Sequence, residues 1–164
     1  MKFRYLVLAG TLAAFPVAAE DVQFEGHVLE VDASQEARVI VRMAGTRYRL
    51  PGTAAQIVDK AEKCVTGQKG LALVSTDAAG GTLAASGRAD YRQRWSTRSI
   101  RANLRIEASD GYFRIEQTDL AQAEGGSAEL ADDAYAPVSH AGDWENAVTA
   151  AIAMESRLVD CLYR

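Results

Sequence analysis

The chain has 164 residues, with 18 lysine and arginine residues against 22 aspartate and glutamate residues and a formal net charge of −4 at pH 7. This acidic balance argues against nucleic acid as a partner and against adsorption to anionic lipid, because both kinds of binding depend on a basic protein surface. After residue 19 no apolar run approaches the ~20 residues that cross a bilayer, so we expect no membrane anchor.

The N-terminus has the pattern of a cleavable secretory signal peptide. Two basic residues among the first four precede an apolar stretch that ends at Phe15, and the small residues Val17-Ala18-Ala19 fit a cleavage site. Removal of residues 1–19 leaves 20–164, which we predict to be a single α+β domain located in a periplasm or secreted. With 16 basic and 22 acidic residues, this mature chain is more acidic than the precursor.

Two strands and a helix are predicted in the first part of the mature chain. Residues 22–31 mix apolar and charged side chains as an edge strand does, whereas 37–43 are richer in β-branched residues. Tyr48-Arg49-Leu50 continues this second strand or pairs with it before Pro51-Gly52 breaks it. Thr53 is placed to cap the helix that follows. The apolar residues of that helix at helical spacing are Ile57, Ala61, Cys64 and Val65.

An antiparallel meander is predicted after this helix. The short apolar run 71–75 suits a buried strand, and a glycine-rich turn leads into a second strand, 82–92. The third strand, 100–108, alternates apolar and polar residues most clearly, so one of its faces is expected to be buried and the other wet. Asp110-Gly111 favours a type I′ hairpin turn, which folds this strand back into 112–118.

The C-terminal part is predicted as a loop followed by a helix. Residues 121–139 lack periodicity and are expected to form an acidic surface loop that is at least partly mobile. Asp143 is placed to cap the last helix, whose apolar stripe includes Cys161. The whole pattern predicts an α+β fold, with an antiparallel meander of about four to six strands, two helices packed on one face and the other face exposed.

The two cysteines favour one disulfide bond. Exported proteins meet oxidising conditions, only Cys64 and Cys161 are available, and they lie on the two predicted helices. In the chain-entropy model, a bridge that closes so long a loop stabilises the fold by roughly 4 to 5 kcal/mol. A reactive thiol is the alternative, but the sequence has no C-x-x-C motif to support it.

Three segments resemble a known family. They are the helix that ends near Cys64, the glycine-flanked strand Gly81–Gly87, and Leu104–Asp119, which contains the hairpin sequence DGYFRI. Together they resemble the uncharacterised exported-protein domain family described as having a TATA-box-binding-protein-like (TBP-like) fold. The resemblance covers roughly residues 37–120 and the final helix. It implies this fold and brings no catalytic residues and no mechanism.

No catalytic or metal-binding motif stands out from the residues themselves. His27 and His140 are far apart, and neither has another ligand type at metal spacing, so we interpret one as a strand residue and the other as a loop residue. Asp132-Asp133 with Glu129 offers weak calcium ligands, but paired acids in a loop are usually solvated. We therefore expect no cofactor and no metal.

Charge is segregated in the second half of the chain. Residues 88–114 hold seven arginines and three acids, whereas 115–145 hold eight acids and no lysine or arginine. Arginine and tryptophan are common interface anchors. The candidate binding surface consists of Arg92, Arg94, Trp95, Arg98, Arg101 and Arg105. In the alternative interpretation these arginines pair with acids across strands, and the acidic loop folds over them.

These features favour a non-enzymatic accessory or binding protein of the cell envelope, whose partner is an envelope protein or a small anionic ligand. This hypothesis predicts an uncovered sheet face with Trp95, Arg101 and Arg105 accessible. An alternative is an inhibitor of an envelope or foreign enzyme that acts through residues 121–139. A small hydrolase is less favoured, because it predicts a pocket in which titratable groups converge, such as His140 with a nearby acid.

Overall fold

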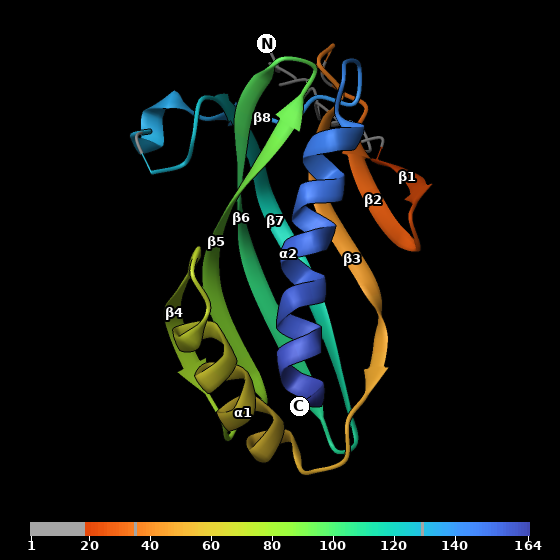
Figure 1. The fold of residues 1–164 in the computed structure, drawn as a ribbon. Helices are drawn as coiled ribbons and strands as arrows, with labels where there is room; N and C mark the ends of the chain where they lie inside the picture. Colours follow the sequence, from red (N-terminus) through yellow and green to blue (C-terminus); the bar gives the residue numbers. More distant parts are fainter. Residues whose placement is uncertain (1–18, 35, 129) are drawn as a thin grey trace, which may run out of the picture.

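One antiparallel sheet of eight strands and two α-helices make up the part of the chain that the computed structural model describes, residues 19–34, 36–128 and 130–164 (Figure 1). The strands are β1 (Ala19–Phe24), β2 (His27–Asp32), β3 (Val39–Arg49), β4 (Leu71–Asp77), β5 (Thr82–Gln93), β6 (Ser96–Ser109), β7 (Tyr112–Glu124) and β8 (Ala136–Pro137). The helices are α1 (Ala54–Gly67), α2 (Glu145–Tyr163) and the short 3₁₀ helix η1 (Asp132–Ala134). The sheet order is β1-β2-β3-β7-β6-β5-β4, and β8 pairs with β7.

The N-terminal region differs from its prediction. Residues 22–31, predicted as one edge strand, belong to the hairpin β1–β2, which turns at Glu25 and Gly26 with φ of 47° and 79°. A single glycine in a mixed polar pattern did not reveal this turn. The extra hairpin and the short β8 bring the number of strands above the four to six predicted. The predicted signal peptide, 1–19, lies outside the described residues except for Ala19, the first residue of β1.

The strand β4 was predicted to be buried, and this prediction was wrong. It is the last strand in the sheet order, and Val74 is 67% exposed. A short apolar run does not distinguish a central strand from an edge strand, because both are rich in the same residues. The hairpin at Asp110-Gly111 was predicted correctly, since Ser109 pairs with Tyr112. Its turn is not the predicted type I′, because Gly111 has a φ of 82° but Asp110 does not have a positive φ.

The two helices begin differently. Thr53 caps α1 as predicted, because its hydroxyl accepts from the backbone N–H of Gln56 at 3.3 Å and its own N–H donates to the Gln56 side chain at 2.9 Å. The prediction for α2 was wrong. Its N-cap residue is Trp144, and the Oδ2 of Asp143 instead accepts a hydrogen bond of 3.1 Å from Gln93 at the end of β5.

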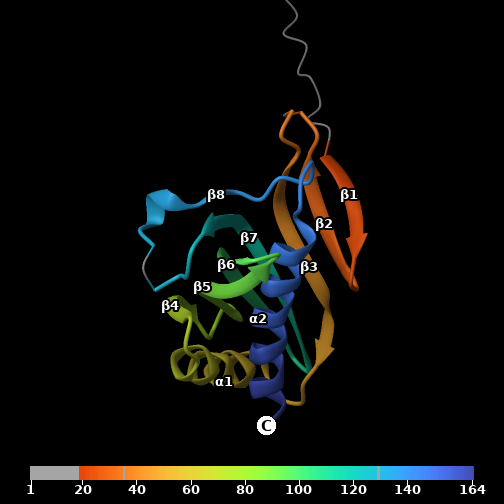
Figure 2. The ribbon, with the colours of Figure 1, turned by 45° about the horizontal axis from the view of Figure 1, so that its top comes forward.

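Both helices cover the same face of the sheet (Figures 1 and 2). Helix α1 packs on β4, β5 and β6, helix α2 packs on β5 and β6, and the helices contact each other. The largest buried side chains between the layers include Ile57, Leu83, Ile100, Leu104, Ile106 and Met154. Gly87 permits α2 to come this close, since a Cβ there would overlap the Met154 side chain. The opposite face, called the open face below, carries no α-helix in the part of the chain that the structure describes.

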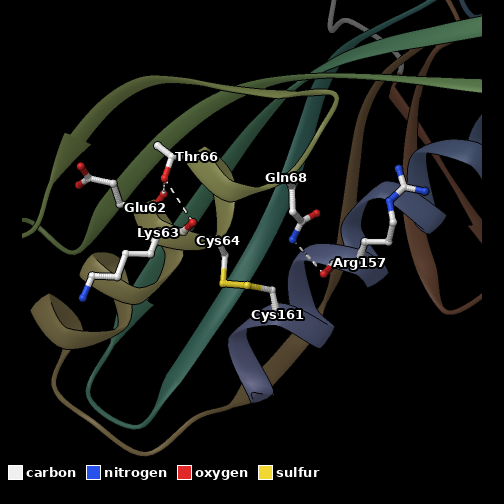
Figure 3. The surroundings of a disulfide bond; sticks show 7 residues. All are labelled: Glu62, Lys63, Cys64, Thr66, Gln68, Arg157 and Cys161. Carbon is white, nitrogen blue, oxygen red and sulfur yellow. Dashed lines mark hydrogen bonds between the residues drawn. A yellow bond between two sulfur atoms is a disulfide. The ribbon is translucent and has the colours of Figure 1, made fainter.

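The predicted disulfide between Cys64 and Cys161 is confirmed, and it links α1 to α2 (Figure 3). Their Cα atoms are 5.8 Å apart, within the usual range for a bridged pair. Beside it, the side chain of Gln68, the C-cap residue of α1, donates a hydrogen bond of 3.0 Å to the backbone oxygen of Arg157 in α2, a second contact between the helices. None of the helices in the described ranges is long and apolar enough to cross a membrane.

Candidate functional site

Arg88 of β5 and Arg101 of β6 lie directly opposite each other on the open face. The register of these strands pairs the two residues. Arg88 follows Gly87, which faces the helices, and Arg101 stands between the buried residues Ile100 and Ala102, so both arginines point away from the core. Like charges directly opposite each other destabilise an antiparallel pair. This position therefore calls for a neighbouring anion or another stabilising group.

Tyr135 and Asp132 supply these groups from the segment that follows β7. The guanidinium carbons of Arg88 and Arg101 lie 5.7 Å and 5.2 Å from the centroid of the Tyr135 ring. The carboxylate of Asp132 forms an ion pair with Arg88 and lies 3.5 Å from Nη1 of Arg101, which also donates to the Asp132 backbone oxygen at 3.1 Å. Tyr135 is buried, and its hydroxyl accepts a hydrogen bond of 2.9 Å from Ser99.

Arg88, Arg101 and Asp132 border a hollow of about 410 Å³ on the open face. Its polar lining consists of Ser86, Arg88, Arg101, Asn103, Asp119 and Asp132, and we call it the arginine hollow. Asn103 and Asp119 form a second pair in it, with a hydrogen bond of 2.7 Å from the amide to the carboxylate. The hollow thus has a positive pair and a polar, acidic pair side by side.

Arg105 lies on the open face outside the arginine hollow. Its Nε lies 3.1 Å from Oε1 of Glu107, and Oε2 of the same carboxylate accepts a hydrogen bond of 2.8 Å from Arg114 on β7. Arg114, followed by Arg105, holds the pKa of Glu107 below its ordinary value. Arg114 and Glu107 pair across strands, as in the alternative prediction, whereas Arg105 pairs with an acid of its own strand.

The remaining predicted residues gather at the far end of the β5–β6 hairpin. Trp95 is 100% exposed at the turn, next to Arg94, which has a φ of 54° and lies 3.6 Å from Asp143. Arg98 donates to Glu124 at 2.7 Å, and its place two residues before Ile100 puts it on the helix side of the sheet. Arg92 is exposed beside them.

The residues of the predicted binding surface therefore lie in separate regions of the sheet. Arg101 lies six positions after Trp95, a distance of about 20 Å in the direction of β6 at the usual rise per residue. Sequence reasoning did not assign Arg88, Asp132 or Tyr135 to the site. The alternation of β5 was the available signal for Arg88, since it follows Gly87 and so falls on the same side as the polar residues.

The acidic loop predicted at 121–139 is partly regular structure. Its first residues, 121–124, complete β7, and β8 pairs with that strand at Ala121 and Gln122. Val138 is fully buried and bonds through its backbone to both Leu120 and Ile40. The segment is thus attached to the sheet at Val138, and one of its acids, Asp132, reaches the arginines.

A separate polar cluster is buried between the sheet and α2. Glu155 is 1% exposed, and its carboxylate accepts hydrogen bonds from the Tyr48 hydroxyl at 3.0 Å and the Gln117 amide at 3.1 Å. Nε2 of His27 lies 3.3 Å from Oε1 of Glu155. That carboxylate raises the pKa of His27 above its ordinary value, with burial opposing the shift. Burial and the same carboxylate raise the pKa of Tyr48 to about 12. We call these four residues the Glu155 cluster.

His140, the candidate catalytic histidine of a hydrolase, lies outside the Glu155 cluster. The ring of His140 stacks on Trp144 with centroids 4.8 Å apart, while Asp143 contacts Gln93 and Arg94. Within the residues that the structure describes, no group of three or more His, Cys, Asp and Glu side chains is placed to hold a metal ion.

Two solved structures share the arrangement of strands and helices. A TBP-like protein from Parabacteroides distasonis ATCC 8503 matches with a TM-score of 0.57 and 12% identity, covering 79% of this chain and 96% of that chain. A DUF4468 family protein from Bacteroides ovatus ATCC 8483 matches with a TM-score of 0.52 and 16% identity, covering 87% and 90%. The chain has a TBP-like fold. No protein-family model matches the sequence, and no curated protein matches it significantly.

The predicted resemblance to a TBP-like domain is therefore confirmed for the fold. Identities of 12% and 16% support a common fold and do not transfer function. Any function of this TBP-like domain has to be argued from its own residues.

Proposed function

We propose that this TBP-like domain is a non-enzymatic, exported binding protein of the cell envelope that receives an anionic group at the arginine hollow. The observation that carries the proposal is the pair Arg88 and Arg101, set opposite each other and over the ring of Tyr135. The partner is an acidic envelope protein or a small anionic ligand.

The arginine hollow has the features that anion recognition needs. A guanidinium group presents a planar set of donors that matches a carboxylate, and an aromatic ring beneath it limits the orientations it can adopt. Neighbouring β-strands fix the Cα positions of both arginines, so little ordering of the backbone is needed on binding. The ion-pair row through Arg105 also has one carboxylate for two arginines, but the side chain of Glu107 is 41% exposed and so more enclosed than that of Asp132, which is 73% exposed.

Export is supported by two independent features. Residues 1–19 have the composition of a signal peptide. The Cys64–Cys161 disulfide is typical of proteins that mature in oxidising compartments. Cell fractionation with an antibody against the mature domain tests this part, and recovery of full-length, reduced protein in the cytoplasm would contradict it.

A crosslinking pull-down from envelope extract tests the binding function. The purified mature protein is compared with an Arg88→Ala, Arg101→Ala double variant and with Arg105→Ala as a control on the same face. We expect the wild type and the control to capture the same partner and the double variant to lose it. Equal capture by all three proteins would show that the arginine hollow is not the binding surface.

The inhibitor alternative places the function in residues 121–139 instead. Because Tyr135 and Val138 are buried, deleting this segment would uncover the sheet, and a point substitution is the cleaner test. Asp133 is exposed beside Asp132, and no ion pair of it is seen among the described residues. Loss of the captured partner on Asp133→Lys, with capture unchanged by the double arginine variant, would favour the inhibitor.

A further inference from the structure

We propose that the Arg88–Arg101 pair is a carboxylate-binding site which the chain's own Asp132 occupies in the free protein, and that an acidic segment of a partner protein binds by displacing Asp132. This inference rests on the function proposed above, and it adds both the ligand class and a means of control.

The first step is that the arginine pair requires an anion. Arg88 and Arg101 face each other across the strands, and their charges repel. In the free protein Asp132 provides the negative charge, since its carboxylate contacts both guanidinium groups. A carboxylate is therefore a group that this site already accommodates.

The second step is that Asp132 can leave without dismantling the site. Its side chain is 73% exposed, so rotation about the side-chain bonds carries the carboxylate into solvent. Tyr135 is 8% exposed and is held by Ser99, and it remains under the arginines when Asp132 turns away. Exposed ion pairs contribute little stability, so replacing the Asp132 carboxylate by another carboxylate costs little free energy.

The third step concerns the kind of ligand. The arginine hollow lies on an open sheet face and is lined mainly by polar groups, unlike the enclosed, apolar pockets that hold small molecules. Asp119, at the end with Asn103, disfavours a second negative group there. These features fit a protein segment that places one carboxylate between the arginines and neutral polar or basic groups beside Asp119.

The test measures binding of a fluorescein-labelled peptide, with one glutamate flanked by serine and lysine residues, by fluorescence anisotropy at an ionic strength of about 0.15 M. Wild type, Asp132→Asn and Asp133→Asn are compared. The two variants remove the same charge from neighbouring exposed positions, so only Asp132→Asn removes the internal competitor. We expect Asp132→Asn to tighten binding by about three- to tenfold and Asp133→Asn to resemble the wild type.

The Arg88→Ala, Arg101→Ala variant separates failure of this inference from failure of the proposed function. If it loses the peptide while Asp132→Asn binds like the wild type, the arginine hollow is a binding site and the displacement of Asp132 is wrong. If the peptide binds neither the wild type nor Asp132→Asn, the carboxylate assignment is wrong, and the envelope pull-down still decides the proposed function.

Competition by small anions shows whether the site prefers a protein segment or a free small anion. Succinate should displace the peptide only weakly, because it lacks the neighbouring groups of a protein segment. Displacement by succinate at the concentrations at which the peptide itself binds would overturn the acidic segment as ligand. Stronger displacement by inorganic phosphate than by succinate would overturn the choice of a carboxylate.

Discussion

Nε2 of His27 lies 3.3 Å from Oε1 of Glu155, and both residues are buried. His27 begins β2 and Glu155 lies in α2, so this contact connects the N-terminal part of the sheet to the C-terminal helix. Tyr48 and Gln117 add hydrogen bonds from β3 and β7 to the same carboxylate. A buried charge is tolerated only with such partners, and loss of one partner is expected to be costly.

The contact with Glu155 predicts a pH dependence of stability. Nδ1 of His27 is 3.1 Å from the backbone oxygen of Glu25 and Nε2 faces the Glu155 carboxylate, so the protonated ring suits both neighbours. Because the pKa of folded His27 is raised above 6.5, its charged form stabilises the fold fully below pH 6.5, and this contribution is lost as pH rises through the raised pKa. Urea unfolding should show a larger difference between wild type and His27→Gln at acidic than at alkaline pH. An equal difference at both would contradict the prediction.

Gly45 is predicted to be essential for the same cluster. A Cβ at this position would overlap Oε1 of Glu155 and lie 3.3 Å from Nε2 of His27. Gly45→Ala should therefore destabilise the fold by about 1–3 kcal/mol, as overpacking of a filled interior does. Gly142→Ala is the matched control, because nothing lies within 4 Å of a Cβ there. Equal free energies of unfolding for the two variants would show that Glu155 moves aside freely.

Local patterns were sufficient to predict several elements of the fold. The alternation of apolar and polar residues in 100–108 predicted β6, since successive side chains of a strand point to opposite faces of the sheet. Thr53 marked the start of α1 because a capping box involves only neighbouring residues. The single available cysteine pair predicted the link between the helices. The turn at Glu25-Gly26 escaped prediction because β1 and β2 are each only six residues long and mix apolar with charged residues, so together they resemble one longer edge strand.

The arginine hollow depends on relationships that no local pattern contains. Arg88 and Arg101 face each other because the turn at Arg94-Trp95 has two residues and so fixes the register of β5 and β6. Neither turn residue is a glycine or asparagine, the types that usually signal such a turn. Asp132 reaches the pair only because the chain returns to the sheet after β7, and the path of that return is set by tertiary contacts.

The disulfide is predicted to contribute most of the stabilisation that the chain-entropy model gives for closing a loop of this length. Cys64 and Cys161 are 97 residues apart, for which the chain-entropy model gives about 4 to 5 kcal/mol. A Cys64→Ser, Cys161→Ser variant should lose stability of this order in urea unfolding. Wild type in excess reductant is the control and should behave like the variant. A loss below about 1 kcal/mol would mean that the unfolded chain remains compact without the bridge.

Tyr135 is predicted to support the arginine hollow through its ring. Tyr135→Phe removes the hydroxyl that accepts from Ser99 and should cost about 1 kcal/mol of stability, while the single-glutamate peptide still binds. Tyr135→Ala also removes the surface under both guanidinium groups and should weaken that binding several-fold. Circular dichroism of each variant shows whether the sheet is intact. If a folded Tyr135→Ala protein binds the peptide as tightly as Tyr135→Phe does, the strands alone hold the arginines in place and the ring contributes only to packing.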